Sequence, residues 1–523
     1  MTGDDLDLAL LVGSVVLLVA IAAVRLAVGS GLPTLLLYLG LGLLLGEDAL
    51  GFDFDDAELA RALGYAALVL ILAEGGLTTS WRSIRPVVPA AAVLATLGTA
   101  VSVLVVGGAA HVLLDVGWRD ALLIGAVLSP TDSAAVFSVL RRVPLPPRIA
   151  GLLEAESGFN DAPVVIVVVA LAGVSSAPSW YELLALIGYE LAVGAVVGLA
   201  VGFAGGWGVR RIALPSSGLY PLAVLALCVT AYGAAAVVHA SGFLAVYLSA
   251  LVLGNVRLPH RPATRGFVEG VAWLAQIGLF VMLGLLATPS ELGPSIVPAL
   301  GIGLVLLVVA RPLSVVVSLA PFGTRRGAAH GASALEEQGA GRGWRFPTTW
   351  RERGLLSWAG LRGAVPVVLA TVPADKDVFN LVFVLVVVFT VVQAPTLPAV
   401  VRRLRLTEGG AAQTLDIESS PLTRLDADLL QVHVAPGSRL AGVEVFELSL
   451  PEGAAVTLVV RGGDAFVPAP STPLRVGDDL ILVATDAVRR DVERRLRAVS
   501  TGGRLADWHT PRPRPRRPRR PRR

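Results

Sequence analysis

Long apolar runs dominate the sequence and limit the folds that it can adopt. Hydrophobic residues make up 54% of the 523 residues and charged residues only 16%, and the mean hydropathy is +0.72. A soluble protein of this length could not cover its surface with so few charges. The lipid bilayer is therefore the expected partner, and runs of about 20 mostly apolar residues predict thirteen transmembrane helices. The predicted spans are 8–28, 33–50, 60–79, 87–113, 119–140, 149–173, 181–208, 217–239, 243–256, 267–287, 294–320, 355–373 and 377–401.

The charges of the loops between these spans alternate along the chain. Every second loop is basic, as at 210–211 and 402–405, whereas the loops between them are acidic or neutral apart from Arg61, Arg119 and Lys376. Because cytoplasmic loops carry the excess of arginine and lysine, this pattern predicts an outside N-terminus and a cytoplasmic C-terminus. An even number of spans would destroy the alternation.

The composition changes after Arg405, and this change divides the chain into three parts. Residues 1–405 form the predicted transmembrane domain. In residues 416–500, short β-type runs at 429–435, 454–460 and 479–485 alternate with turn signals and precede a charged helix. They predict a small cytoplasmic α+β domain. Residues 501–523 end in alternating proline and arginine and are predicted to be disordered, either solvated or in contact with anionic lipid headgroups.

Polar residues interrupt five of the apolar spans. An ionisable side chain in the bilayer core costs at least about 3 kcal/mol, so such residues predict a functional site. The polar or helix-breaking positions are Glu74 in the third span; Pro130, Thr131 and Asp132 in the fifth; Glu154, Glu156, Ser157, Asn160 and Asp161 in the sixth; Gln276 in the tenth; and Arg362, Gly363 and Pro366 in the twelfth.

Helix geometry relates the polar residues of the sixth span to one another. At about 100° per residue, Glu156 and Asn160 lie about 40° apart, as do Ser157 and Asp161. These four residues are predicted to share one stripe of the helix. Glu154 is about 200° from Glu156 and is expected to face the cytoplasmic loop instead.

Helix breakers occur in the fifth and twelfth spans. Pro130 in one, and Gly363 with Pro366 in the other, are predicted to interrupt the helices and free backbone carbonyl groups at membrane depth. The two spans are seven apart and run in opposite directions. This placement predicts an inverted repeat whose two broken helices cross near the middle of the membrane.

The residue types at these places indicate the chemistry of the site. Asp161 and Asp132 offer hard oxygen ligands, with Ser157, Thr131 and freed carbonyls beside them, which suits a monovalent cation or a proton. A carboxylate held away from water can bind either one, but not comfortably both. Arg362 is the expected countercharge and Glu156 its expected partner, in a pair with a structural role. No enzymatic activity, no cofactor and no nucleic-acid partner are expected.

Three of these motifs resemble the cation:proton antiporter family that includes the NhaP-type sodium/proton exchangers. They are Thr131-Asp132, the run 156–161 and the run 360–366, and the resemblance covers about residues 8–405. It implies an alternating-access carrier of the elevator type, usually a homodimer. It further implies that Asp161 carries the ion and the proton, that Asp132, Thr131, Ser157 and Asn160 belong to the ion site, and that Glu74 lines the cytoplasmic path. The Asn-Asp pair at 160–161 implies electroneutral exchange.

The C-terminal segment resembles the TrkA-C (RCK-C) regulatory domain. The resemblance covers about 426–497 and rests on turn motifs at 434–438, 450–453, 461–463 and 475–478. Such domains dimerise and in some proteins bind a small effector, such as a cyclic dinucleotide. Antiporters with this appendage are often potassium/proton exchangers, which favours K⁺ over Na⁺ as the substrate that exchanges for H⁺.

These observations predict a potassium/proton antiporter of a prokaryotic inner membrane. Sodium/proton exchange is the close alternative, because the site residues do not separate the two ions. A regulated cation channel would need a selectivity filter, and no TVGYG-type run is present in the sequence. A membrane sensor without transport would leave Asp161 unexplained.

Overall fold

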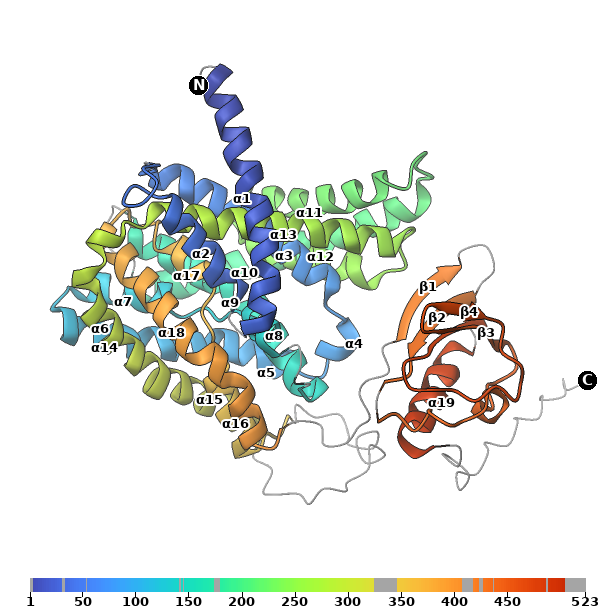
Figure 1. Ribbon diagram of the computed structural model, residues 1–523. Helices are drawn as coiled ribbons and strands as arrows, with labels where there is room; N and C mark the ends of the chain where they lie inside the picture. The colour runs from blue at the N-terminus through green and yellow to red at the C-terminus, as the bar shows by residue number, and fades with distance from the viewer. Residues whose placement is uncertain are drawn as a thin grey trace, which may run out of the picture. The chain divides into compact units, whose positions relative to one another are not determined.

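The computed structural model describes residues 3–30, 33–52, 54–140, 143, 145–173, 179–323, 346–406, 417–422, 427–435, 437–485 and 488–503. The chain divides into two compact units, Met1–Thr407 and Glu408–Arg523. The first is built of helices, and the second contains a β-sheet (Figure 1). Most of the predicted disordered tail, from 504 onward, lies outside the described residues.

Each of the thirteen predicted spans coincides with a helix or with a run of consecutive helices. Within the described residues, eight helices are long and apolar enough to cross a membrane, and three shorter apolar helices accompany them. The mostly helical fold class is confirmed, whereas the number of crossings stays a prediction. The helices are α1 (Gly3–Ser30), α2 (Thr34–Leu45), α3 (Ala57–Thr78), α4 (Trp81–Ile84), α5 (Val88–Val93), η1 (Leu94–Gly98), α6 (Thr99–Leu114), α7 (Trp118–Val127), α8 (Ser133–Leu140), α9 (Pro147–Ala172), α10 (Trp180–Arg211), α11 (Leu219–Val237), α12 (Gly242–Asn255), α13 (Arg261–Leu286), η2 (Pro289–Glu291), η3 (Gly293–Ser295), α14 (Ile296–Val305), η4 (Leu306–Ala310), α15 (Arg311–Leu319), η5 (Ala320–Phe322), α16 (Trp350–Trp358), α17 (Ala364–Leu369) and α18 (Lys376–Arg403).

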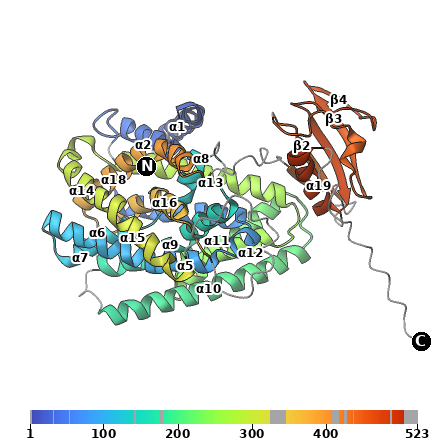
Figure 2. The same cartoon turned by 90° about the horizontal axis from the view of Figure 1, so that it is seen from below.

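The helices of the first unit form two bundles. Helices α1–α3 pack with α10–α13 in the first bundle, and α4–α9 pack with α14–α18 in the second. In both views α6, α7 and α14 lie together on one side of the unit, and α11 and α12 lie on the other (Figures 1 and 2). Glycines let the helices of the first bundle approach closely: a Cβ atom at Gly198 of α10 would run into the backbone of Ala245 of α12. The bundles meet where α9 and α17 contact α3, α12 and α13.

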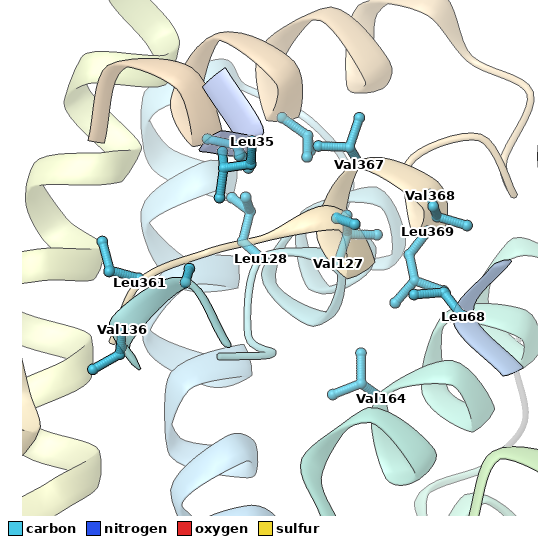
Figure 3. Close-up of a cluster of buried hydrophobic side chains, with 14 of the residues drawn as sticks. Leu35, Leu68, Val127, Leu128, Val136, Val164, Leu361, Val367, Val368 and Leu369 are labelled. Atoms are coloured by element: carbon cyan, nitrogen blue, oxygen red, sulfur yellow. The ribbon is translucent and has the colours of Figure 1, made fainter. Parts of the chain in front are cut away.

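Two interrupted helices lie inside the second bundle. One apolar segment is split into α7 and α8 by residues 128–132, and another into α16 and α17 by residues 359–363. The two breaks meet, because the backbone N–H of Asp132 donates to the carbonyl oxygen of Leu361 at 2.8 Å. Figure 3 shows Leu128 and Leu361, one from each break, in the same apolar cluster.

Pro130 and Gly363 lie within these breaks, whereas Pro366 does not. Pro366 is the third residue of α17. In the first turn of a helix the backbone N–H has no intrahelical partner, so a proline is tolerated there. The interruption at 359–363 therefore ends before Pro366.

The second unit contains a five-stranded sheet covered by one helix. The strands are antiparallel to their neighbours and lie in the order β1-β2-β5-β3-β4. Alternate residues of the central strands, such as Leu430 and Leu480, are buried and pack with Val492 and Leu496 of the helix. The predicted α+β domain is thus confirmed as a fold. Its elements are β1 (Ile417–Leu422), β2 (Ala427–His433), η6 (Val445–Leu448), β3 (Ala454–Arg461), β4 (Asp464–Phe466), β5 (Asp479–Thr485) and α19 (Arg489–Gly502).

A carboxylate is buried just before the central strand β5. Asp478 accepts two hydrogen bonds from the guanidinium of Arg461, both at 2.8 Å, and one from the backbone N–H of Arg475 at 2.8 Å. Burial alone raises the pKa of Asp478, but the bonds from Arg461 and from Arg475 outweigh it and hold the pKa below its usual value. The carboxylate is therefore charged at neutral pH and joins the turn after β3 to the start of β5.

Candidate ion-binding site

A cavity of about 460 Å³ lies where the two bundles meet. Its first wall comes from α3, α12 and α13, which contribute Glu74, Tyr247 and Gln276. Its second wall comes from α9 and from the two helix breaks. The predicted site residues that line it are Glu74, Pro130, Thr131, Asp132, Ser157, Asp161, Gly363 and Pro366.

Asp161 is the most deeply placed carboxylate of this cavity. Its side chain is buried on α9, and within the described residues its Oδ1 atom has no hydrogen-bond partner. An unpartnered carboxylate oxygen in such a place costs free energy unless a cation or a proton binds to it. The orphaned oxygen therefore fits the predicted role of an ion or proton ligand.

Oxygen atoms from α9 and from the first break line the cavity together with Asp161. Asp132 accepts a hydrogen bond at Oδ1 from the backbone N–H of Ala135 at 3.1 Å, so its carboxylate caps α8. Ser157 accepts one at Oγ from the backbone N–H of Ser133 at 3.3 Å. Thr131 is buried and lines the same cavity. Two carboxylates and two hydroxyl groups are thus available to a hard monovalent cation.

Asn160 does not line the cavity. Its Nδ2 atom donates to Oγ1 of Thr131 at 2.9 Å, and both residues are buried. Asn160 therefore contacts the ion site through Thr131, which it holds against α9. A role of Asn160 in ion binding stays a prediction.

The predicted single stripe on α9 is divided in the structure. Glu154, Ser157, Gly158 and Asp161 line the cavity, in the i, i+3, i+4, i+7 pattern of one helix face. Glu156 instead faces the interior of the second bundle, where its partner lies. Glu154, which was expected to face the cytoplasmic loop, also lines the cavity, and its carboxylate accepts a hydrogen bond from the hydroxyl of Thr79, the residue that follows α3.

The predicted pair of Glu156 with Arg362 was also wrong. Glu156 accepts two hydrogen bonds from Arg311, from Nη1 at 2.5 Å and from Nη2 at 3.0 Å, and both side chains are buried. This bidentate geometry satisfies both carboxylate oxygens at once. The sequence signal for Arg311 was its position as the one charged residue within the apolar run 294–320.

Arg362 instead donates hydrogen bonds to the backbone of the first helix break. Its Nη1 atom donates to the carbonyl oxygens of Ser129 and Pro130, which the interruption after α7 leaves without helical partners. The C-terminal end of a helix carries a partial negative charge, so the guanidinium compensates the end of α7. In the same way, the carboxylate of Asp132 lies at the positive N-terminal end of α8.

Gly363 lies against the carboxylate of Asp132. A Cβ atom at this position would overlap that carboxylate, so only glycine fits between the second break and Asp132. We expect Gly363→Ala to displace Asp132 and to lower the transport rate at least about 5-fold, because overpacking a tight site costs about 1–3 kcal/mol. Ion flux in reconstituted vesicles measures this. Gly278→Ala is the matched control, since a Cβ atom there meets nothing within 4 Å; equal rates for the two variants would contradict the tight fit.

The fold and the site define a class of membrane protein: a helical carrier in which two interrupted helices meet beside a buried carboxylate. Residues 14–403 match the family model of the transmembrane sodium/hydrogen exchangers, and residues 429–497 match the TrkA-C domain. The chain therefore belongs to the sodium/hydrogen exchanger family, which confirms the predicted family.

Several named relatives match most of the chain. It is 34% identical to the K(+)/H(+) antiporter NhaP of Alkalimonas amylolytica, over 94% of this chain and 83% of that protein. It is 31% identical to the K(+)/H(+) antiporter NhaP2 of Shewanella oneidensis, over 93% and 83%. The sodium proton antiporter MjNhaP1 of Methanocaldococcus jannaschii has a similar fold, with a TM-score of 0.64 at 22% identity, over 77% of this chain and 100% of that one.

Proposed function

We propose that the chain exchanges K⁺ for H⁺ across the inner membrane of a prokaryotic cell. The observation that carries the proposal is Asp161, a buried carboxylate with an unpartnered oxygen in a cavity shared with Asp132, Thr131 and Ser157. The names of the two K(+)/H(+) antiporter relatives support the choice of K⁺. No resident cofactor takes part; K⁺ and H⁺ are the substrates.

The exchange follows from one carboxylate binding two cations in turn. When Asp161 holds a proton it is neutral, and when it holds K⁺ the pair is neutral as well. A charge that is neutralised in either way crosses the membrane interior at a much lower cost than a bare carboxylate. The empty site is charged and therefore does not cross at a useful rate. The movement of K⁺ in one direction is thus coupled to the movement of H⁺ in the other.

The two bundles suggest how the site reaches both sides of the membrane. The cavity lies at their contact, with Asp161 on the second bundle and Glu74 on the first. Sliding of the second bundle along the first would carry Asp161 from one side to the other without unfolding any helix. In this proposal Glu74 and Glu154 attract cations to the cytoplasmic opening.

Further features of the protein belong to the same proposal. The N-terminus lies outside and the C-terminus in the cytoplasm, two copies form a homodimer, and the C-terminal unit responds to a small nucleotide. Exchange is electroneutral, with Asn160 supplying no second charge beside Asp161. Sodium/proton exchange is the second candidate, favoured by the 26% identical Na(+)/H(+) antiporter ApNhaP of Aphanothece halophytica, which matches 77% of this chain.

A dequenching assay in everted vesicles tests the proposal. A pH-sensitive dye reports proton release on addition of K⁺, Na⁺ or Li⁺ at several pH values. We expect the largest response to K⁺, and less than about a twofold change in rate when a membrane potential is imposed, because one-for-one exchange moves no net charge. A response to Na⁺ alone would select the second candidate, and a strong dependence on potential would overturn the electroneutral stoichiometry.

A further inference from the structure

A second, much smaller cavity lies inside the second bundle. Its volume is about 10 Å³, and it shares no lining residue with the larger cavity. Arg311 at the start of α15 and Gly360 and Arg362 in the second break form part of its wall, together with Gln393 of α18. The remaining wall is apolar, and it includes Leu306 and Leu307 from the π-helical turn η4. The cavity thus joins three helices at the point where one of them is interrupted.

Two hydrogen-bond donors on residues of this wall lack a partner in the part of the chain that the structure describes. Within the described residues, the Nε–H groups of Arg311 and Arg362 make no hydrogen bond, although the two residues are only 5% and 2% exposed. Both Nη atoms of Arg311 donate to Glu156, and Nη1 of Arg362 donates to the carbonyl groups of the first break. A buried N–H group without an acceptor costs about 1–3 kcal/mol, so two of them in one wall point to an acceptor between them.

The surrounding charges indicate that this acceptor is neutral. The carboxylate of Glu156 balances the charge of Arg311. The carbonyl oxygens of Ser129 and Pro130, at the negative end of α7, partly balance that of Arg362. An anion is therefore not required for charge balance.

The size of the cavity leads to the same conclusion. A bound water needs about 10–15 Å³ of free volume and two to four polar partners. The cavity offers about 10 Å³, two N–H donors and the amide of Gln393. A halide ion is larger than water and would have to push the walls apart.

We propose that one water molecule is bound in this cavity and accepts hydrogen bonds from Nε of both Arg311 and Arg362. The side-chain amide of Gln393 lines the cavity and donates through Nε2 to the carbonyl oxygen of Trp358 at 3.2 Å, and in this proposal its oxygen accepts one hydrogen of the water. The water links the Glu156–Arg311 pair to the second helix break, so that α9, α15 and the break form one rigid part. This assignment is independent of which cation the protein transports.

A map of the full-length protein at about 2 Å resolution tests the assignment directly. We expect a density peak at hydrogen-bond distance, about 2.7–3.2 Å, from both Nε atoms. Gly360→Ala then removes the space, because its Cβ atom would lie 2.8 Å from Nε of Arg311. We expect this variant to lack the peak and to melt at least about 2 °C lower.

Gly354→Ala is the matched control in the neighbouring helix. Its Cβ atom would meet only a side-chain carbon of Leu404 at 3.9 Å, so its melting temperature should not fall. Absence of the peak in the wild-type map would overturn the proposal, as would equal melting temperatures for the two variants. A rise in melting temperature when chloride replaces gluconate, seen in wild type and lost in Gly360→Ala, would assign an anion and equally overturn it. Should Gly360→Ala not fold, the wild-type map decides alone.

Discussion

Asp161→Asn should abolish exchange while leaving the protein folded in the membrane. The amide has the size and shape of the carboxylate but can neither release a proton nor carry the charge that attracts a cation. We expect the rate of proton release in everted vesicles to fall at least about 100-fold, the effect of losing roughly 3 kcal/mol of ion binding. Asp161 is buried and lines the 460 Å³ cavity, so the change acts on the site itself.

Asp120→Asn is the matched control for this experiment. It makes the same chemical change at an exposed position on α7 and should leave the rate unchanged. The amount of each variant in the membrane and its melting temperature separate loss of function from loss of folding. Exchange at the wild-type rate in Asp161→Asn would remove this residue from the mechanism.

Removing Arg311 should destabilise the protein more than any other single change proposed for the site. Arg311→Met leaves the carboxylate of Glu156 buried and uncompensated, which costs about 3–5 kcal/mol. The double variant Glu156→Leu/Arg311→Met removes both charges, and an apolar pair of similar volume is often as stable as a buried ion pair. We therefore expect the melting temperature to fall sharply in the single variant and to recover in the double one.

A second double-mutant cycle separates the two arginines. Glu156→Leu combined with Arg362→Met should show a much smaller interaction energy, because Arg362 donates to carbonyl oxygens of the first break rather than to Glu156. Recovery of stability with Arg362→Met, and none with Arg311→Met, would restore the pair predicted from the sequence and contradict the structure.

These two arginines also show which features of the site could be predicted from the sequence and which could not. The cost of a charge in the bilayer marks Glu156, Asp161 and Arg362 as important without any knowledge of the fold. The pairing of these charges could not be predicted in the same way, since Glu156 and Arg311 lie 155 residues apart in the sequence. Pairing at that separation depends on how the helices pack, and no local pattern reports it.

The helix α9 illustrates the same limit. Its period gives the angles between residues but not the direction in which any of them points. The sequence therefore placed Glu154 opposite Glu156, as the structure does. It predicted that Glu156 shares the face of the site residues, whereas in the structure Glu154 lines the cavity and Glu156 pairs with Arg311. The helix breaks were easier to locate, because Pro130 and Gly363 alter the backbone locally, and so were the strands of the second unit, whose alternating pattern is local as well.

Transport kinetics at varied pH test most directly whether one carboxylate serves both ions. With K⁺ and H⁺ competing for Asp161, the apparent KM for K⁺ should rise as the pH falls, approaching about tenfold per pH unit, while the maximal rate stays constant. A KM that does not change with pH, with only the maximal rate falling, would mean that the two ions bind at separate groups and would contradict the account.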